Sequence, residues 1–208
     1  AGNDSYAGST DISAGALVVA SNTATPGQTF VTVNTGATLA IADGVSARIG
    51  SLADGPLGSG TVLIGLIDPA TQLTIGGNSA GSTTFSGTIM GAGSLTLSDA
   101  ASLTLTGTGS AIGGDLELCN CSTGGLTIDG GSLSVAGLSM GVSVFGGTLA
   151  VTNGGTLQIG TSSQPSNLLV ASNMTITGPG STVTTSGFTG FGIFGPGTLT
   201  ISNGGMLV

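Results

Sequence analysis

The chain has 208 residues, of which 41 are glycine and only 5% are charged, and its formal net charge is −8. Arg48 is its single basic residue, so the chain cannot neutralise the phosphates of a nucleic acid or bind anionic lipid headgroups electrostatically. No apolar run approaches the roughly 18–20 residues of a membrane-spanning helix.

The hydrophobic content of 39% argues for a packed core and against a disordered, low-complexity tract. Helices are not expected, because Gly, Ser and Thr fill most windows and no 3.6-residue period persists. No basic segment precedes an apolar stretch, so no signal peptide is seen. The pattern is cut at both ends, and we expect the chain to be a piece of a longer protein.

Short strand signals of the form aliphatic-x-aliphatic recur along the chain, bounded by Gly, Asn, Asp or Ser. In residues 113–208 they align as four coils of three strands, with a period of 23–26 residues. The side chains predicted to face inward are Leu116/Leu118, Leu126/Ile128 and Leu133/Val135; Val142/Val144, Leu149/Val151 and Leu157/Ile159; Leu168/Val170, Met174/Ile176 and Val183; and Phe191/Ile193, Leu199/Ile201 and Leu207. Such a period predicts a β-solenoid of eight or nine coils, with three short strands and about 24 residues per coil.

The segment GGTLAVTNGGTLQIG, residues 146–160, could instead form a hairpin, because Asn-Gly between alternating apolar residues favours one. A hairpin leaves the period unexplained. We therefore predict that Asn153-Gly154 turns a corner between two strands of one coil. Asp129-Gly130 and Asn203-Gly204 are predicted to occupy the equivalent corners.

Two segments of the first half share a more specific pattern. Residues 83–105 read TTFSGTIMGAGSLTLSDAASLTL, and residues 2–19 read GNDSYAGSTDISAGALVV. Both resemble the autotransporter-associated β-strand repeat. The matching residues are Thr84, Phe85, Ser86, Gly87, Ile89, Gly91, Gly93, Ser94, Leu95, Leu103 and Leu105 in the first segment, and Asn3, Tyr6, Gly8, Thr10, Ile12, Gly15, Leu17 and Val19 in the second. Leu97 and Asp99-Ala100-Ala101 depart from the usual Lys and Gly-x-Gly without changing the inward pattern.

The resemblance implies an all-β, right-handed parallel β-helix from the secreted passenger of a Gram-negative autotransporter. Residues 1–208 would be a single β-helix segment, with coils like the family repeat in 1–112 and regular coils in 113–208. The implied partners are the rest of the passenger and a C-terminal translocator barrel in the outer membrane, and the implied location is the cell surface or the extracellular space.

We therefore expect a structural or adhesive segment rather than an enzyme, acting as a stalk or as an interaction surface for glycans or proteins of a host or neighbouring cell. The alternative is a β-helical enzyme acting on polysaccharide, or a carbohydrate-binding solenoid. A calcium-loaded repeat is not expected, because the nine carboxylates lack the Gly-Gly-x-Gly-x-Asp spacing.

The only cysteines are Cys119 and Cys121. They could form a small disulfide ring, remain two thiols, or supply half of a metal site. Structural zinc normally takes four Cys or His ligands, and the chain has no His and no further Cys, so no metal site is expected. A local disulfide requires a bend between the two residues. Such a bend is expected here, where the first strand of the coil ends, and passengers of the family often carry few, closely spaced cysteines. We therefore favour a local disulfide between Cys119 and Cys121.

Asp115 and Glu117 lie two residues apart on a predicted strand and are the best candidates for a catalytic carboxylate pair. The aligned positions of the next coil are Gly141 and Ser143, and Arg48 is distant in sequence, so we expect a solvated face, no catalytic residues and no cofactor.

Regular threonine ranks on a solenoid can bind ice. The outward columns are interrupted here, which argues against ice binding; they read Thr127, Ala150, Thr175, Thr200 and Ser134, Gln158, Thr184.

Overall fold

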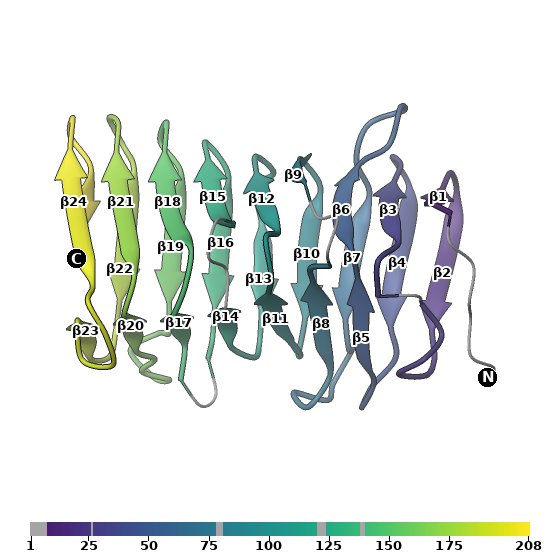
Figure 1. Cartoon of the computed structure of the whole chain (residues 1–208), viewed down its shortest axis with the longest axis horizontal. Helices are drawn as coiled ribbons and strands as arrows, with labels where there is room; N and C mark the ends of the chain where they lie inside the picture. Colours follow the sequence, from purple (N-terminus) through teal and green to yellow (C-terminus); the bar gives the residue numbers. More distant parts are fainter. Residues whose placement is uncertain (1–7, 26, 78–80, 120–123, 138–139) are drawn as a thin grey trace.

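The structure, a computed structural model, describes residues 8–25, 27–77, 81–119, 124–137 and 140–208. Within these ranges the chain forms a parallel β-solenoid of about eight turns, with roughly 23 residues per turn and no helix (Figure 1). A helix of the length and apolarity needed to cross a bilayer is therefore absent from the described ranges.

The coils build three faces, here called sheets I, II and III, and the chain visits them in that order. Sheet I contains β5 (Ser46–Ile49), β8 (Gln72–Ile75), β11 (Ser94–Leu97), β14 (Leu116–Leu118), β17 (Val142–Val144), β20 (Leu168–Val170) and β23 (Thr189–Phe191). Sheet II contains β9 (Ser82–Phe85), β12 (Ser102–Leu105), β15 (Gly125–Asp129), β18 (Thr148–Thr152), β21 (Asn173–Thr177) and β24 (Thr198–Ser202).

In the first coils, a separate three-stranded sheet forms the face that sheet II forms later, and its strand β6 packs beside β9. It consists of β1 (Thr10–Ile12), β3 (Phe30–Val33) and β6 (Ser51–Asp54). Sheet III runs along nearly the whole rod and consists of β2 (Gly15–Val19), β4 (Ala37–Ile41), β7 (Thr61–Ile64), β10 (Thr88–Gly91), β13 (Ser110–Ile112), β16 (Ser132–Val135), β19 (Thr156–Ile159), β22 (Thr182–Thr185) and β25 (Met206–Leu207).

The core is a stack of aliphatic side chains in the register that the period predicts. Leu126 pairs with Leu149, and Leu149 pairs with Met174, in parallel. Every predicted inward residue from Leu116 to Val183 is at most 2% exposed. Strand alternation explains this result: alternate side chains point to opposite faces of a strand, so each strand sends its aliphatic residues inward. The prediction of a three-strand coil is confirmed.

In the pair Phe191/Ile193 the prediction fails at Ile193, whereas Phe191 packs against the core as predicted, in a shifted register. Phe191 pairs with Val170, so Thr189 rather than Phe191 lies opposite Leu168. Strand β23 ends at Phe191, and Gly192 follows with a left-handed φ of 73°. Ile193 consequently lies beyond the turn and is 50% exposed. Phe-Gly-Ile has the spacing of an inward pair, but the glycine in it turns the chain.

Ile201 is 44% exposed although its column is otherwise buried, with Ile176 at 0%. The cause is its position: β24 pairs only with β21 and is the terminal strand of sheet II. Ile201 therefore faces inward as predicted, with no further strand stacked on it.

The corners after sheet II are tight turns rather than hairpins. Strands β18 and β19 flank Asn153-Gly154 but belong to different sheets. Asn153 and Gly154 have φ values of 51° and 81°, and Asn203 and Gly204 have 52° and 85°. Left-handed φ is tolerated mainly by Gly and Asn, which explains their use at these corners.

The segment 83–105 follows the same inward pattern. Phe85, Ile89, Leu95, Leu103 and Leu105 are all at most 1% exposed. The strand ladder continues across residue 112, because β13 pairs with both β10 and β16. Asn3 and Tyr6, which the resemblance also uses, lie outside the described residues.

Candidate interaction surfaces

The predicted carboxylate pair is divided between two roles. Glu117 lies in the outward rank of sheet I and pairs in register with Ser143, as the sequence alignment predicts. The Oδ1 atom of Asp115 accepts hydrogen bonds from the backbone N–H groups of Met140 and Gly141, at 3.1 and 2.9 Å. Asp115 therefore caps a corner of the next coil and is not simply a solvated carboxylate.

Other carboxylates hold neighbouring coils together in the same way. Oδ1 of Asp43 accepts from the backbone N–H groups of Leu66, Ile67 and Asp68, at 2.7, 3.1 and 3.1 Å. The N–H groups of Ile67 and Asp68 are the main cause that lowers the pKa of Asp43. Sequence reasoning missed this role because the donors lie more than 20 residues further along the chain.

A hollow of about 540 Å³ at the first coil is lined by residues 10–14, 16 and 17. Among these lining residues only Asp11 is acidic. Its carboxylate accepts hydrogen bonds from Thr32 and Asn34 at 2.6 and 2.7 Å. The Thr32 hydroxyl is the largest cause that lowers the pKa of Asp11. This carboxylate, too, is engaged in joining two coils.

Arg48 forms an ion pair with Asp99, which lies at a corner of another coil. The two side chains are 46% and 36% exposed. Arg48 and Asp99 are 51 positions apart in the sequence, and stacking of the coils brings their side chains together. The positive charge of Arg48 is thus matched locally.

Cys119 follows β14, and its backbone N–H donates to the carbonyl of Leu97 at 3.0 Å. Burial and the carboxylates of Glu117 and Asp99 raise the pKa of its thiol. Cys121 lies outside the described residues, so the disulfide stays a prediction. Within the described ranges no three His, Cys, Asp or Glu side chains cluster as metal ligands would.

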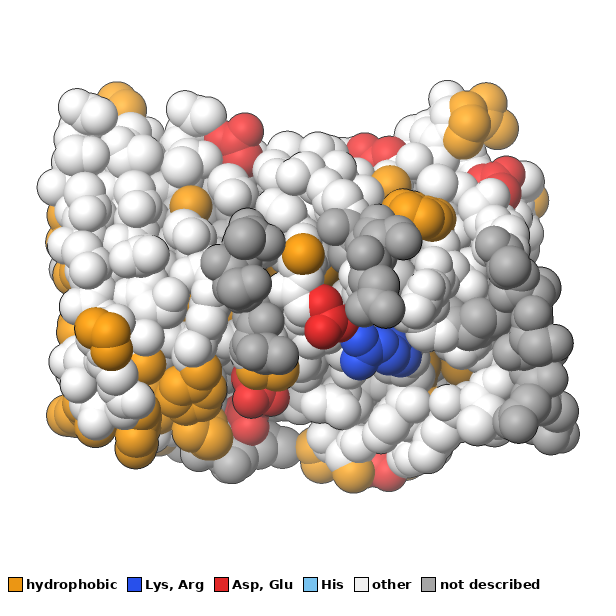
Figure 2. All heavy atoms as spheres, viewed as in Figure 1, with side chains coloured by type: hydrophobic (Ala, Val, Ile, Leu, Met, Phe, Trp, Pro, Cys, Tyr) orange, Lys and Arg blue, Asp and Glu red, His pale blue; other side chains and the backbone are white. Residues whose placement is uncertain are grey.

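The outward face of sheet II is rich in hydroxyl groups and carries one carboxylate among the described residues, Asp129 at the end of β15. Its central rank follows the predicted column and continues one coil after another as Thr84, Thr104, Thr127, Ala150, Thr175 and Thr200. Figure 2 shows the part over β18, β21 and β24 almost free of charged and apolar side chains. Ala150 interrupts the rank, as the sequence predicts.

The outward face of sheet I becomes apolar toward β23. Four side chains, here called the aromatic plaque, gather there: Phe145, Phe188, Ile193 and Phe194. Their exposures are 37, 57, 50 and 65%. The rings of Phe145 and Phe194 meet edge to face, with centroids 5.8 Å apart and planes at 74°. In Figure 2 an orange cluster lies over this corner of the rod, near β17, β20 and β23.

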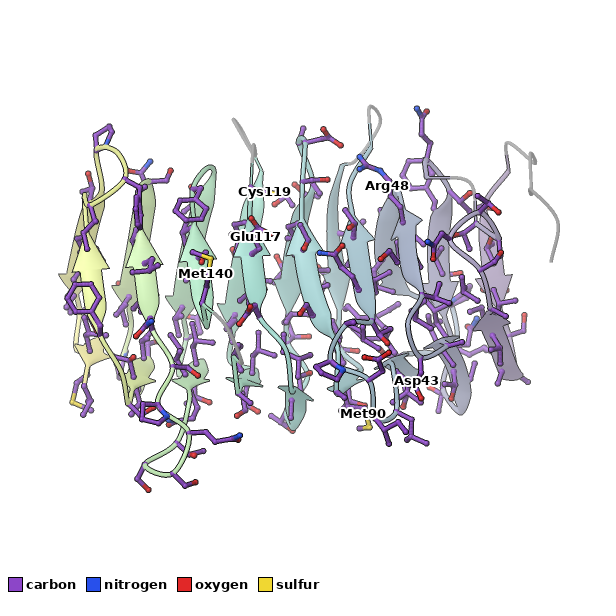
Figure 3. All side chains as sticks on the ribbon, turned by 90° about the horizontal axis from the view of Figure 1, so that it is seen from below. Asp43, Arg48, Met90, Glu117, Cys119 and Met140 are labelled. Atoms are coloured by element: carbon purple, nitrogen blue, oxygen red, sulfur yellow. The ribbon has the colours of Figure 1, made fainter. Side chains whose placement is uncertain are left out.

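Figure 3 shows how these surfaces are separated around the rod. Glu117, Cys119 and Arg48 lie along one side, whereas Asp43 and Met90 lie on the opposite side. The plaque and Glu117 share the outward face of sheet I, because Glu117 pairs with Ser143 two residues before Phe145. This face therefore combines apolar, acidic and hydroxyl groups.

Comparison of the chain with protein-family models, curated proteins and solved structures gave no match. The fold is accordingly assigned from the strand ladders alone.

Proposed function

We propose that this solenoid is a structural and adhesive segment of a secreted passenger on the surface of a Gram-negative cell. It acts as a stalk and as an interaction surface. The supporting observation is the set of parallel ladders that join coil to coil through sheets I, II and III. At about 4.8 Å per coil, eight turns make a rod roughly 40 Å long.

The sequence supports the secretory part of the proposal. Residues 83–105 resemble the autotransporter-associated repeat, and their apolar positions are those that the solenoid buries. The proposed partners are the remainder of the passenger and a translocator barrel. Both are proposals from the resemblance.

The use of the carboxylates favours a structural over a catalytic role. Asp43, Asp115 and Asp129 each accept hydrogen bonds from a neighbouring coil. Each of these carboxylates is engaged as a hydrogen-bond acceptor that joins two coils, which is a structural role.

Surface display tests the proposal. The reading frame that encodes the chain is expressed in a Gram-negative host, and intact cells are treated with protease. We expect the solenoid to be cleaved or released from intact cells and to raise cell adhesion to glycan- or protein-coated surfaces. A solenoid that stays inside the cell would contradict the secretory part.

The matched control is Leu149→Asp, which places a charge in the core and should disrupt coil stacking while every outward side chain keeps its identity. Purified solenoid is also incubated with neutral and acidic polysaccharides, and new reducing ends are measured. Steady release of reducing ends would overturn the non-enzymatic assignment and support the alternative of a polysaccharide-acting β-helix.

A further inference from the structure

We propose that the aromatic plaque and the adjoining Glu117 form a binding site for a neutral carbohydrate chain. This inference rests on the adhesive function proposed above and names the ligand class and the site. It uses only the outward face of sheet I between β14 and β23.

The plaque is fixed in place by its neighbours. Gly190 lies under it, and a Cβ added there would lie 2.7 Å from Cε1 of Phe188 and would collide with Cδ1 of Ile193. Phe188 and Ile193 can therefore lie close against the sheet only because residue 190 has no side chain. Leu169 points outward between Ser143 and Gly190 yet is only 9% exposed, so surface side chains cover it.

The exposed rings lie outside the hydrophobic core. Phe188 and Phe194 are more than half exposed, and the core cluster contains neither. A contiguous apolar patch bordered by polar groups marks an interaction site in many soluble proteins. The edge-to-face pair of Phe145 and Phe194 offers a ring surface on which the apolar C–H face of a pyranose can stack.

The border of the plaque carries a hydrogen-bond acceptor. Glu117 is partly exposed and pairs in register with Ser143, two residues before Phe145. Its carboxylate oxygens can accept hydrogen bonds from sugar hydroxyl groups.

Charge selects among carbohydrates. Arg48, the only basic side chain in the chain, is paired with Asp99, and the chain carries a net charge of −8. A uronic acid, sialic acid or sulfated sugar would meet Glu117 without a cation to compensate it. A neutral hexopyranose donates hydroxyl hydrogens and adds no negative charge, so it is the complementary partner.

Isothermal titration with soluble neutral glucan and mannan oligosaccharides tests the site, with alginate and hyaluronan oligosaccharides as acidic probes. We expect binding of a neutral oligosaccharide and at least tenfold weaker binding of the acidic ones. Phe194→Ser and Phe145→Ala should each weaken the neutral ligand at least tenfold. Phe30→Ser is the matched control, because Phe30 is 43% exposed on β3, outside the plaque, and should leave affinity unchanged.

Glu117→Gln keeps an amide oxygen as acceptor and removes the charge. We expect it to reduce the discrimination against acidic oligosaccharides while retaining neutral binding within about threefold. Circular dichroism of each variant verifies that the solenoid is folded. The proposal would be overturned if Phe30→Ser lost binding, if the plaque variants bound neutral oligosaccharide as tightly as the unmodified chain, or if the chain preferred the acidic probes.

A failure here differs from a failure of the proposed function. Suppose that the unmodified chain binds no neutral sugar, while cells that display the Phe194→Ser solenoid still adhere. This result would refute the carbohydrate site and leave the proposed adhesive function standing. Undiminished plaque-dependent binding to cell-surface proteins stripped of their glycans would identify a protein partner and would also overturn it.

Discussion

Asn153 donates a hydrogen bond from Nδ2 to Oδ1 of Asp129, one coil earlier, at 2.5 Å. The hydroxyl of Thr152 donates to the same oxygen at 2.8 Å. Two coils further on, Asn203 reaches back to Oγ1 of Thr177 at 3.2 Å. The residue that lets the backbone turn thus also joins its coil to the preceding one.

Substitution of Asn153 separates these two contributions. Asn153→Gly keeps the left-handed φ of 51° accessible but removes the bond to Asp129, and should cost about 0.5–1.5 kcal/mol. Asn153→Ala also places a Cβ in a left-handed conformation, which adds about 1–2 kcal/mol. In urea unfolding, the free energy of unfolding should therefore be highest for the unsubstituted chain, lower for Asn153→Gly and lowest for Asn153→Ala. Equal stabilities for Gly and Ala would show that the backbone conformation here carries no strain.

The core column supplies a second test. Leu149 is 0% exposed, and Leu149→Ala should lower the free energy of unfolding by about 2–5 kcal/mol, because it leaves a cavity between two coils. Ala150→Ser changes the neighbouring outward side chain and should alter the unfolding free energy by less than about 0.5 kcal/mol. A larger effect of the outward change would refute the inward assignment of Leu149.

Acid should weaken the stacking of coils. The folded-state pKa of Asp43 is lowered, so the unfolded chain binds more protons than the folded chain around and below about pH 4. The stability that Asp43 contributes is complete above its unfolded pKa and is lost as the pH falls through its folded pKa. Asp11 acts in the same direction. We expect the melting temperature to fall between about pH 6 and about pH 3.

Asp43→Asn retains an acceptor oxygen and removes the titration. Its melting temperature should therefore fall less over the same pH range than that of the unsubstituted chain. A variant whose melting curve shifts with pH as much as the parent would show that Asp43 is not linked to stability.

The state of the cysteines is open to a direct assay. If Cys119 and Cys121 are bridged, alkylation of the denatured, unreduced chain should add no label. After reduction, alkylation should add two labels. The mass of the intact chain measures the number of labels. Reduction itself should change stability little, because the closed ring is small. Labelling without reductant would refute the predicted disulfide.

The strands could be predicted from sequence wherever a period was visible. Leu149 and Val151 repeat the spacing of Leu126 and Ile128, and parallel stacking preserves such spacing from coil to coil. Phe191 and Ile193 repeat it too, but Gly192 ends the strand between them. Periodicity identifies candidate pairs, whereas the backbone angle of one glycine decides whether they share a strand.

The surfaces could be predicted less well. The plaque joins Phe145 to Phe194, which belong to corners of different coils and follow no repeat. The role of Asp115 depends on backbone N–H groups of the next coil. Both features arise from differences between coils, which an alignment based on what the coils share does not detect.

Distances between spin labels test the central claim, that consecutive coils stack in register. Thr200 is labelled together with Thr175, Thr127, Thr104 or Thr84, in a chain whose two cysteines are replaced by serine, and distances are measured by double electron–electron resonance. The backbone separation should grow by about 4.8 Å per coil and reach about 24 Å for Thr84 and Thr200. Distances that do not increase in this order, or that place Thr84 closer to Thr200 than Thr127 is, would contradict the solenoid.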